Sequence, residues 1–202
     1  MIFAILKGGE KTMKPMPQPE VLISARQIQR RVKAMAGQIN RFYADKVNPE
    51  NPLLVVVVMK GAMYFAVDLT RYLTIPFVIR TERVESGWTG SRRSGKKPVI
   101  YDPLSADLAG QHVLVVEDLI DSGEVMNAID AHYGQLKPAS LNVVTVVIKR
   151  GAQTNGQILK RVRWCGFPAV SKDHWLVGYG MDHRGQLRHL GYIGFYPGNK
   201  MP

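Results

Sequence analysis

The longest apolar runs of this chain are short and consist mainly of branched aliphatic residues. They lie at Leu53 to Val58, Val113 to Val116 and Leu141 to Ile148. Runs of this length and composition are typical of strands buried on both faces, as in a parallel sheet covered by helices. Turn-forming residues such as Asn48-Pro49 and Gly134 separate the runs from their neighbours. We therefore expect three buried parallel strands.

Helical periodicity fills the intervals between these strands. Ser24 followed by Gln27 resembles a capping box, and the apolar spacing after it predicts a helix over residues 25–44. Similar spacing predicts helices from Lys60-Gly61 to about Leu73 and from Gly123 to Tyr133. The alternation of strands and helices predicts an α/β domain with a parallel sheet and helices on both faces. Ligands of such folds bind at the carboxyl ends of the strands, here at Lys60, Glu117 and Lys149.

The remaining segments give weaker patterns. Phe77 to Ile79 predicts a short strand, whereas the polar stretch from Arg80 to Pro98 predicts no clear element. Short strands at Trp164 to Val170, Trp175 to Tyr179 and Tyr192 to Tyr196 are expected in a small hood. We expect an N-terminal tail at residues 1–23 and a single domain at 24–202, with the hood formed mainly by residues 160–200.

Composition and charge narrow the class of protein. The 202 residues are 46% hydrophobic, and no apolar run approaches the length of a membrane span, so no membrane partner is expected. Cys165 is the only cysteine and cannot form an intramolecular disulfide, which favours a cytoplasmic location. The formal charge of +11 attracts anions of any kind. Its simplest interpretation is a solubilising surface, unless the cations gather on one face.

The segment with the clearest chemistry runs from Val113 to Met126, with the sequence VLVVEDLIDSGEVM. Four apolar residues lead to Glu117-Asp118, and two more lead to Asp121-Ser122-Gly123. A tight turn before a helix presents N–H groups to phosphate, Gly123 allows close approach, and paired carboxylates suit ribose hydroxyls or a hard cation. The alternative is that the two acids are solvated and Asp121 caps the helix. Spacing alone leaves both interpretations open.

This segment resembles the phosphoribosyl-diphosphate (PRPP) signature of type I phosphoribosyltransferases. From about Ser24 to Leu190, the chain is similar to the hypoxanthine-guanine phosphoribosyltransferase branch, which implies a type I phosphoribosyltransferase-like fold. The resemblance implies that Glu117 and Asp118 hold the ribose hydroxyls and that Asp121 is the catalytic acid/base facing the purine N7. The 5′-phosphate would lie in the cradle formed by Ser122, Gly123, Glu124 and Val125.

Three matches outside the signature extend the resemblance. Lys60-Gly61 corresponds to the pyrophosphate loop, and Lys149 to the lysine that donates to the purine O6. In the segment from Trp175 to Asp182, the family has an aromatic that stacks on the base and a backbone edge, here Leu176, that reads it. Arg188 would bind pyrophosphate. Taken singly, each has a plain alternative: a strand-to-helix turn, a surface lysine or a core tryptophan.

The resemblance implies purine salvage: ribose 5-phosphate passes from PRPP to hypoxanthine or guanine, giving IMP or GMP and pyrophosphate. Mg²⁺ is the implied cofactor, with Glu117, Asp118 and Asp182 as the candidate metal residues. A homodimer or homotetramer is expected, and nucleic acid is not expected as a partner.

The chain departs from the family pattern at two places, the phosphate loop, which bears on the affinity for PRPP, and the lid that closes the active site. Glu124-Val125 stands where the phosphate loop usually ends in Thr or Ser, so one hydroxyl donor is missing and one carboxylate is added. The usual lid motif is absent between Thr81 and Lys97, although Arg83 with Thr89 resembles a variant bacterial loop. The same stretch is basic, with Arg92, Arg93, Lys96 and Lys97.

Two other functions compete with purine salvage. An RNA-binding regulator on the same fold would bind RNA with steep salt dependence and carry clustered cations away from the PRPP loop. A phosphoribosyltransferase for another base would turn over uracil or orotate instead of purines. A salt titration of RNA binding and a panel of bases separate these alternatives.

Overall fold

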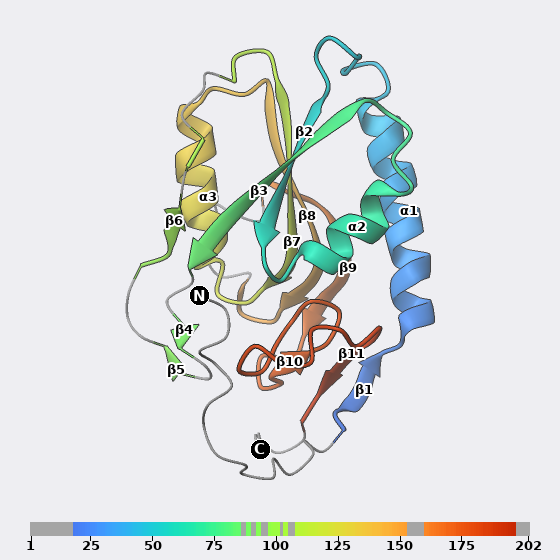
Figure 1. Cartoon of the computed structure of the whole chain (residues 1–202), viewed down its shortest axis with the longest axis vertical. Coiled ribbons are helices and arrows are strands. Elements are labelled where there is room, and N and C mark those ends of the chain that lie inside the picture. The colour runs from blue at the N-terminus through green and yellow to red at the C-terminus, as the bar shows by residue number, and fades with distance from the viewer. Residues whose placement is uncertain are drawn as a thin grey trace, which may run out of the picture.

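Five parallel strands and one antiparallel edge strand form the central sheet (Figure 1). The computed structural model describes residues 18–85, 88–89, 92–93, 97–101, 103–104, 108–152 and 160–196. The strand order is β6-β3-β2-β7-β8-β9, with β6 antiparallel to β3. The strands are β2 (Leu53–Met59), β3 (Phe77–Glu85), β6 (Val99–Tyr101), β7 (His112–Ile120), β8 (Ser140–Lys149) and β9 (Val162–Val170). The expected α/β fold with a mainly parallel sheet is confirmed.

Helices cover both faces of this sheet, as the alternation predicts (Figure 1). Helices α1 (Ala25–Tyr43) and α2 (Met63–Thr70) pack on the face that contains Val55 and Val57. Helix α3 (Glu124–Gln135) packs on the face of Val56 and Val58, so β2 is buried on both sides. No helix among the described residues is long and apolar enough to cross a bilayer.

The first helix begins at the predicted capping box. The Gln27 N–H donates to Ser24 Oγ at 3.4 Å, and the Ser24 N–H donates to Gln27 Oε1 at 2.9 Å. The second helix ends at Thr70, earlier than the predicted Leu73, and Leu73 N–H closes a turn onto the Thr70 carbonyl instead. The sequence therefore predicts both helices, but it does not predict the residue at which the second helix ends.

The strand order places a topological switch point between β2 and β7. From β2 the chain passes through α2 to β3 on one side, whereas β7 lies on the other side of β2 and leads through α3 to β8. The carboxyl ends of β2 and β7 therefore open a crevice, which is where open α/β sheets bind ligands. Lys60-Gly61 and Glu117-Asp118 lie at these two ends.

A three-stranded antiparallel sheet forms the hood at one end of the molecule (Figure 1). It consists of β1 (Glu20–Ile23), β11 (Ile193–Phe195) and β10 (Leu176–Val177), in that order. Residues 20–23 lie in the segment expected to be a tail, yet they pair with β11 and form one edge of the hood. Residues 1–17 of that segment lie outside the described residues.

The predicted hood strand at Trp164 to Val170 is wrong in its location. These residues belong to β9, which pairs in parallel with β8 at the edge of the central sheet. Gly166 and Pro168 give the segment an irregular sequence, but an edge strand tolerates proline, and Gly166 lies against the Val146 carbonyl where a side chain would not fit. Trp164 is buried in the same hydrophobic cluster as α1.

The polar stretch from Arg80 to Pro98 is also more ordered than predicted. Strand β3 continues to Glu85, β6 begins at Val99, and two short strands lie between them, β4 (Trp88–Thr89) and β5 (Arg92–Arg93). Glu82 interrupts the hydrophobic pattern of the strand, although its side chain is fully buried. It can be buried because Arg80 and the Tyr133 hydroxyl both donate to its Oε1. An internal ion pair therefore conceals a strand from pattern reading.

The predicted strand at Trp175 to Tyr179 is shortened to two residues. Gly178, Tyr179 and Gly180 all have positive φ, at 89°, 47° and 100°. A left-handed run of this kind ends the strand and turns the chain back on itself. The turn brings Gly180 against the carbonyl of Gly61, where no side chain would fit.

Candidate active site

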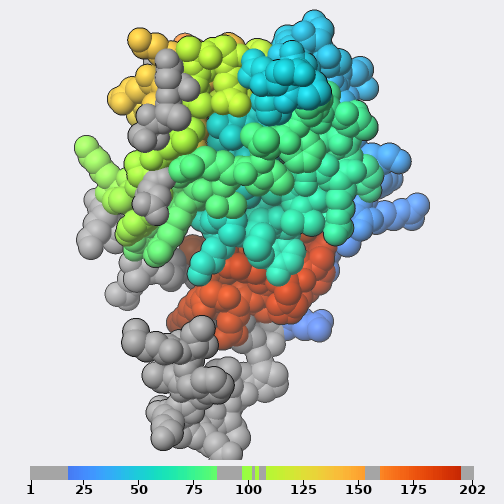
Figure 2. All heavy atoms as spheres, turned by 45° about the horizontal axis from the view of Figure 1, so that its top comes forward, coloured from blue at the N-terminus to red at the C-terminus, as the bar shows by residue number. Residues whose placement is uncertain are grey.

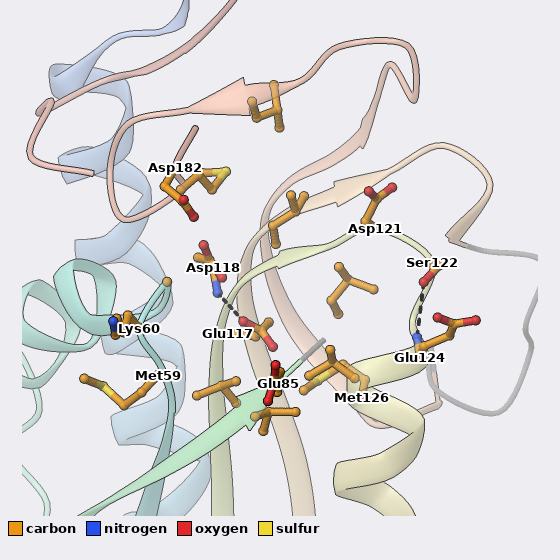
Figure 3. A pocket seen from close by; sticks show the side chains of 18 of the residues that line it. Met59, Lys60, Glu85, Glu117, Asp118, Asp121, Ser122, Glu124, Met126 and Asp182 are labelled. Carbon is orange, nitrogen blue, oxygen red and sulfur yellow. Dashed lines mark hydrogen bonds between the residues drawn. The ribbon is translucent and has the colours of Figure 1, made fainter. Parts of the chain in front are cut away.

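A cleft of about 620 Å³ opens between the carboxyl ends of the central strands and the hood (Figure 2, Figure 3). It brings together residues from five separate parts of the chain. Every site residue predicted from the sequence lines it: Lys60, Gly61, Glu117, Asp118, Asp121, Ser122, Gly123, Glu124, Val125, Lys149, Trp175, Leu176, Asp182 and Arg188. The sequence therefore located the cleft, and the individual roles stay predictions.

Two buried carboxylates lie at the switch point. The exposed fraction of Glu117 is 5% and that of Asp118 is 9%. The Asp118 N–H donates to Glu117 Oε1 at 3.1 Å, and Asp118 lies against Gly61 at the end of β2 (Figure 3). The β2 loop and the end of β7 thus touch through a glycine and a carboxylate.

Burial makes these carboxylates unusual acids. Desolvation, followed by the charge of Asp118, raises the pKa of Glu117 well above its ordinary value. Desolvation likewise raises the pKa of Asp118, against hydrogen bonds that lower it. A buried pair with raised pKa values favours a ligand that brings positive charge or hydroxyl donors into the cleft.

A turn between β7 and α3 contains the residues predicted to hold the 5′-phosphate. Gly123 has φ 83°, and helix α3 starts at the next residue, Glu124, whose N–H donates to Ser122 Oγ at 3.5 Å (Figure 3). The turn therefore directs helix N-terminal N–H groups toward the cleft. Val125 packs against the hydrophobic cluster under α3, so this position adds no hydroxyl to the cradle.

An ion pair links β8 to the cradle. Lys149 Nζ lies 3.2 Å from Asp121 Oδ2, and the side chain of Lys149 is only 6% exposed, compared with 38% for Asp121. A buried ammonium group requires a partner, and Asp121 supplies one in the free protein. A ligand with a carbonyl oxygen could accept a hydrogen bond from Lys149 at the same place.

Hydrogen bonds within the hood fix its cleft-facing loop. Trp175 Nε1 donates to the Asp182 carbonyl at 3.1 Å, and the Gly185 N–H donates to Asp182 Oδ2 at 2.6 Å. Arg188 pairs with Asp182 Oδ1 at 2.5 Å and also donates to the Gly180 carbonyl. The Tyr179 hydroxyl donates to Asp68 on α2 at 2.8 Å, which ties the hood to the main domain.

The three residues predicted to hold a metal lie on the same cleft but do not form a preformed cluster. Among the described residues, no group of three or more His, Cys, Asp or Glu side chains has the arrangement of a metal site. Asp182 already has two partners, Arg188 and the Gly185 N–H. Any metal held here would therefore need further oxygen ligands from water or from a bound phosphate.

The cleft also contains Arg83 of the candidate lid, together with residues that the sequence did not single out. Arg83 and Glu85 reach it from the end of β3, and Arg184 reaches it from the hood. The guanidinium of Arg83 lies 4.7 Å from the ring centre of Tyr101 on β6. The sequence offers one sign that Arg184 belongs to the cleft, namely its position between Asp182 and Arg188.

The predicted basic lid is only partly described. Lys96 lies outside the described residues, and so do the side chains of Thr89, Arg92 and Arg93. Lys97 is exposed, next to β6. Arg83 is the member of the candidate lid that lines the cleft.

Comparison with known proteins agrees with this geometry. The family model described as the phosphoribosyl transferase domain matches residues 23–184. The chain is 33% identical over 175 residues to hypoxanthine phosphoribosyltransferase of Haemophilus influenzae, a match that covers 87% of this chain and 93% of the relative. It is also 33% identical over 193 residues to hypoxanthine-guanine phosphoribosyltransferase of Mycobacterium bovis, covering 95% and 92%.

Solved structures give the same result. The hypoxanthine phosphoribosyltransferase of Trypanosoma cruzi in complex with the product IMP superposes with a TM-score of 0.75 at 28% identity, covering 88% of this chain and 94% of that one. A hypoxanthine-guanine phosphoribosyltransferase of Bacillus anthracis gives a TM-score of 0.71 at 27% identity, covering 89% and 99%.

Proposed function

The chain belongs to the phosphoribosyl transferase family, in its hypoxanthine-guanine branch, and from this premise we propose that it transfers ribose 5-phosphate from PRPP to N9 of hypoxanthine or guanine. The observation that carries the proposal is the Lys149–Asp121 ion pair beside the phosphate cradle. In this proposal the buried ammonium group of Lys149 would donate to the 6-oxo group, and the adjacent carboxylate of Asp121 would share a proton with the purine. The products are IMP or GMP and pyrophosphate.

The reaction breaks the C1′–O bond to diphosphate and forms the C1′–N9 bond. Positive charge develops on the ribose as the diphosphate leaves, so groups that stabilise both partial charges act more strongly in the transition state than in the ground state. Lys60 and Arg188 would bind the leaving diphosphate. Asp121 would accept or share a proton at N7 as the purine attacks, a role typically worth about 100- to 10,000-fold in rate.

We include Mg²⁺ in this proposal as the cofactor. The Glu117–Asp118 pair and Asp182 would hold it, in company with substrate oxygens. Burial of Glu117 and Asp118, which raises the pKa of both, favours a cation beside that pair. When bound, the ion supplies positive charge to the diphosphate and the ribose hydroxyls. Arg188 and the Gly185 N–H would exchange their contacts with Asp182 as the substrate enters.

A panel of bases tests the proposed function. The protein is incubated with PRPP and Mg²⁺ and with hypoxanthine, guanine, xanthine, uracil or orotate, and pyrophosphate release and nucleotide formation are measured. Robust formation of IMP or GMP is expected. Turnover of uracil or orotate without turnover of any purine would overturn the assignment of the base.

We also propose that two copies of the chain associate through the outer face of α2. Helix α2 carries apolar side chains on both its inner and its outer side: Phe65 and Leu69 are buried in the core, whereas Met63 and Val67 are 40% and 46% exposed. Ile79 on the adjacent β3 is 55% exposed on the same side of the sheet. Exposed apolar side chains that gather on one side of a protein are typical of interfaces. Light scattering coupled to size exclusion tests this, with Val67→Glu expected to give a monomer.

A cytoplasmic location is part of the same proposal. The single cysteine, Cys165, leaves no disulfide for an oxidising compartment to form, and burial raises the pKa of its thiol to about 11. Fluorescence microscopy of a tagged chain checks the location.

A further inference from the structure

Helix α1 carries a large share of the positive charge of the protein. Five of its side chains, Arg26, Arg30, Arg31, Lys33 and Arg41, are basic, and none is acidic. This helix of 19 residues therefore contributes +5 to the net charge of +11 of the whole chain. The excess is concentrated on a single element.

Four of the five cations form a stripe on the outward side of α1. At 100° per residue, Arg26, Arg30, Lys33 and Arg41 lie within an arc of about 80°, roughly opposite the arc that packs on the sheet. All four are exposed. The gap in the stripe is at Gly37, and the Arg41 guanidinium lies over it, 3.7 Å from the point where a Cβ would stand. The stripe is therefore continuous over roughly 22 Å.

Several cations elsewhere in the described chain are paired with acids, unlike those of the stripe. Arg71, Arg161, Arg188 and Lys149 each lie within 4.0 Å of a carboxylate. Within the described residues, none of the four stripe cations makes an ion pair. Like charges three and four residues apart destabilise a helix by a few tenths of a kcal/mol each. An uncompensated stripe is therefore an unfavourable arrangement unless an anion binds to it.

An exposed aromatic ring lies beside the stripe. Tyr72 is 43% exposed, and Lys33 Nζ lies 6.0 Å from the centre of its ring. Asn40 on α1 fixes this segment, because its amide donates to the Tyr72 carbonyl at 2.9 Å and its Oδ1 accepts from the Thr74 N–H at 3.0 Å. Arg71 lies next to the ring in the sequence, with a side chain 73% exposed and 3.8 Å from Asp68. Cations with an adjacent exposed aromatic suit a chain of phosphates whose bases can stack.

We propose that the outward face of α1, together with Arg71 and Tyr72, binds single-stranded nucleic acid. Glutamines occupy the margins of the face at positions 27, 29 and 38, and no large apolar side chain lies on it. This composition offers hydrogen bonds to bases and sugars but nothing to insert into a membrane. No residue of α1 lines the cleft of the proposed active site, so both functions can coexist in one molecule.

Fluorescence anisotropy tests this proposal. The probes are labelled 12-nucleotide single-stranded RNA and DNA, the matching duplex, and phosphatidylserine vesicles, each titrated with the full chain from 50 to 300 mM salt. Single strands are expected to bind more tightly than the duplex. Arg30→Gln with Lys33→Gln should weaken binding about tenfold and reduce the slope of log Kd against log salt by about 1.4, the value for two lost phosphate contacts. Turnover of purine should be unchanged.

Matched variants separate this surface from general charge. Lys137→Gln with Lys160→Gln removes the same two charges at exposed sites outside α1 and should leave the affinity within twofold. Tyr72→Ala should weaken binding at least fivefold, and Tyr72→Phe should retain it. Equal losses in the two double variants, preference for the duplex, or binding to vesicles without binding to RNA or DNA would each overturn the proposal.

Discussion

Gly61 lies directly against the carboxylate of Asp118, with no room for a side chain between them. The contact joins the loop after β2 to the end of β7, across the switch point of the sheet. Gly61 is also covered from the other side, because its carbonyl meets Gly180 of the hood. Three parts of the cleft thus meet at one peptide.

Substitution of this glycine should impair activity. In Gly61→Ala, the new methyl group overlaps the buried Asp118 carboxylate, so either the loop or the acid must shift, and kcat/KM for PRPP should fall at least tenfold. Gly134→Ala on α3 is the control, because its methyl group meets no atom within 4 Å. That variant should keep its activity and gain about 0.5 kcal/mol of stability. Similar kinetics for the two variants would contradict the expectation.

Removal of the proposed acid/base should lower turnover far more than binding. Asp121→Asn keeps the size of the side chain but cannot take a proton, so kcat should fall about 100- to 10,000-fold. The dissociation constant of IMP, measured by calorimetry, should change much less. Asp130→Asn is a suitable control, since Asp130 lies on α3 outside the cleft and pairs with Arg161. Unchanged turnover in Asp121→Asn would exclude the assigned role.

Stability should depend on pH through the buried pair. Folding raises the pKa of Glu117. At pH values between its ordinary pKa and its raised pKa, the folded protein therefore holds a proton that the unfolded chain has released. The contribution of Glu117 to stability is therefore fully present below its ordinary pKa and is lost as the pH rises through the raised pKa. Glu117→Gln imitates the protonated acid, so its unfolding midpoint should match that of the wild type at low pH and exceed it near neutrality. A difference that is constant with pH would refute this.

An added hydroxyl in the turn predicted to hold the 5′-phosphate should lower the KM for PRPP. Val125→Thr adds a hydroxyl of similar shape at the start of α3, and one hydrogen bond to a charged phosphate is worth about 1.5–3 kcal/mol. The KM for PRPP should fall about tenfold or more, with little change in kcat. Ile129→Val, which alters the buried face of the same helix, serves as the control for packing. An unaltered KM would mean that the side chain at 125 does not reach the phosphate.

The buried hydrogen bond between Tyr133 and Glu82 should contribute to stability. Tyr133→Phe removes a donor at 2.6 Å from a carboxylate that is fully buried, and should cost about 1–3 kcal/mol in urea unfolding. Tyr101→Phe removes a similar bond to Glu85, but this tyrosine is 40% exposed. The second change should stay within about 0.5 kcal/mol. Equal effects would show that burial does not determine the contribution.

The sequence predicted the parts of the fold that follow from local pattern. Leu53 to Val58 reads as a buried strand because both of its faces are covered, and Ser24 with Gln27 marks a helix start through its own hydrogen bonds. The cleft residues were predictable for a related reason. Glu117, Asp121 and Lys149 follow apolar strands, and the carboxyl ends of parallel strands meet at one edge of the sheet.

What the sequence did not reveal depends on partners that are distant along the chain. Glu82 looks like a solvent-facing residue until Arg80 and Tyr133 are seen to surround it. The assignment of Trp164 to Val170 required knowledge of its pairing with β8, and Glu20–Ile23 becomes a strand only through β11. Pairing of this kind leaves no periodic signal in the segment itself.

The pairing of β1 with β11 has a consequence for the newly made polypeptide. Between Ile23 and Ile193, which are paired in the hood, lie 169 residues. At about 5–20 residues per second on the ribosome, β1 waits roughly 10–30 seconds for its partner strand to be synthesised. The central sheet and its phosphate cradle can fold in that interval, whereas the hood that carries Asp182 closes only after β11 has emerged. If the proposed roles hold, a nascent chain forms its phosphate-binding turn well before it completes the hood that contacts the base.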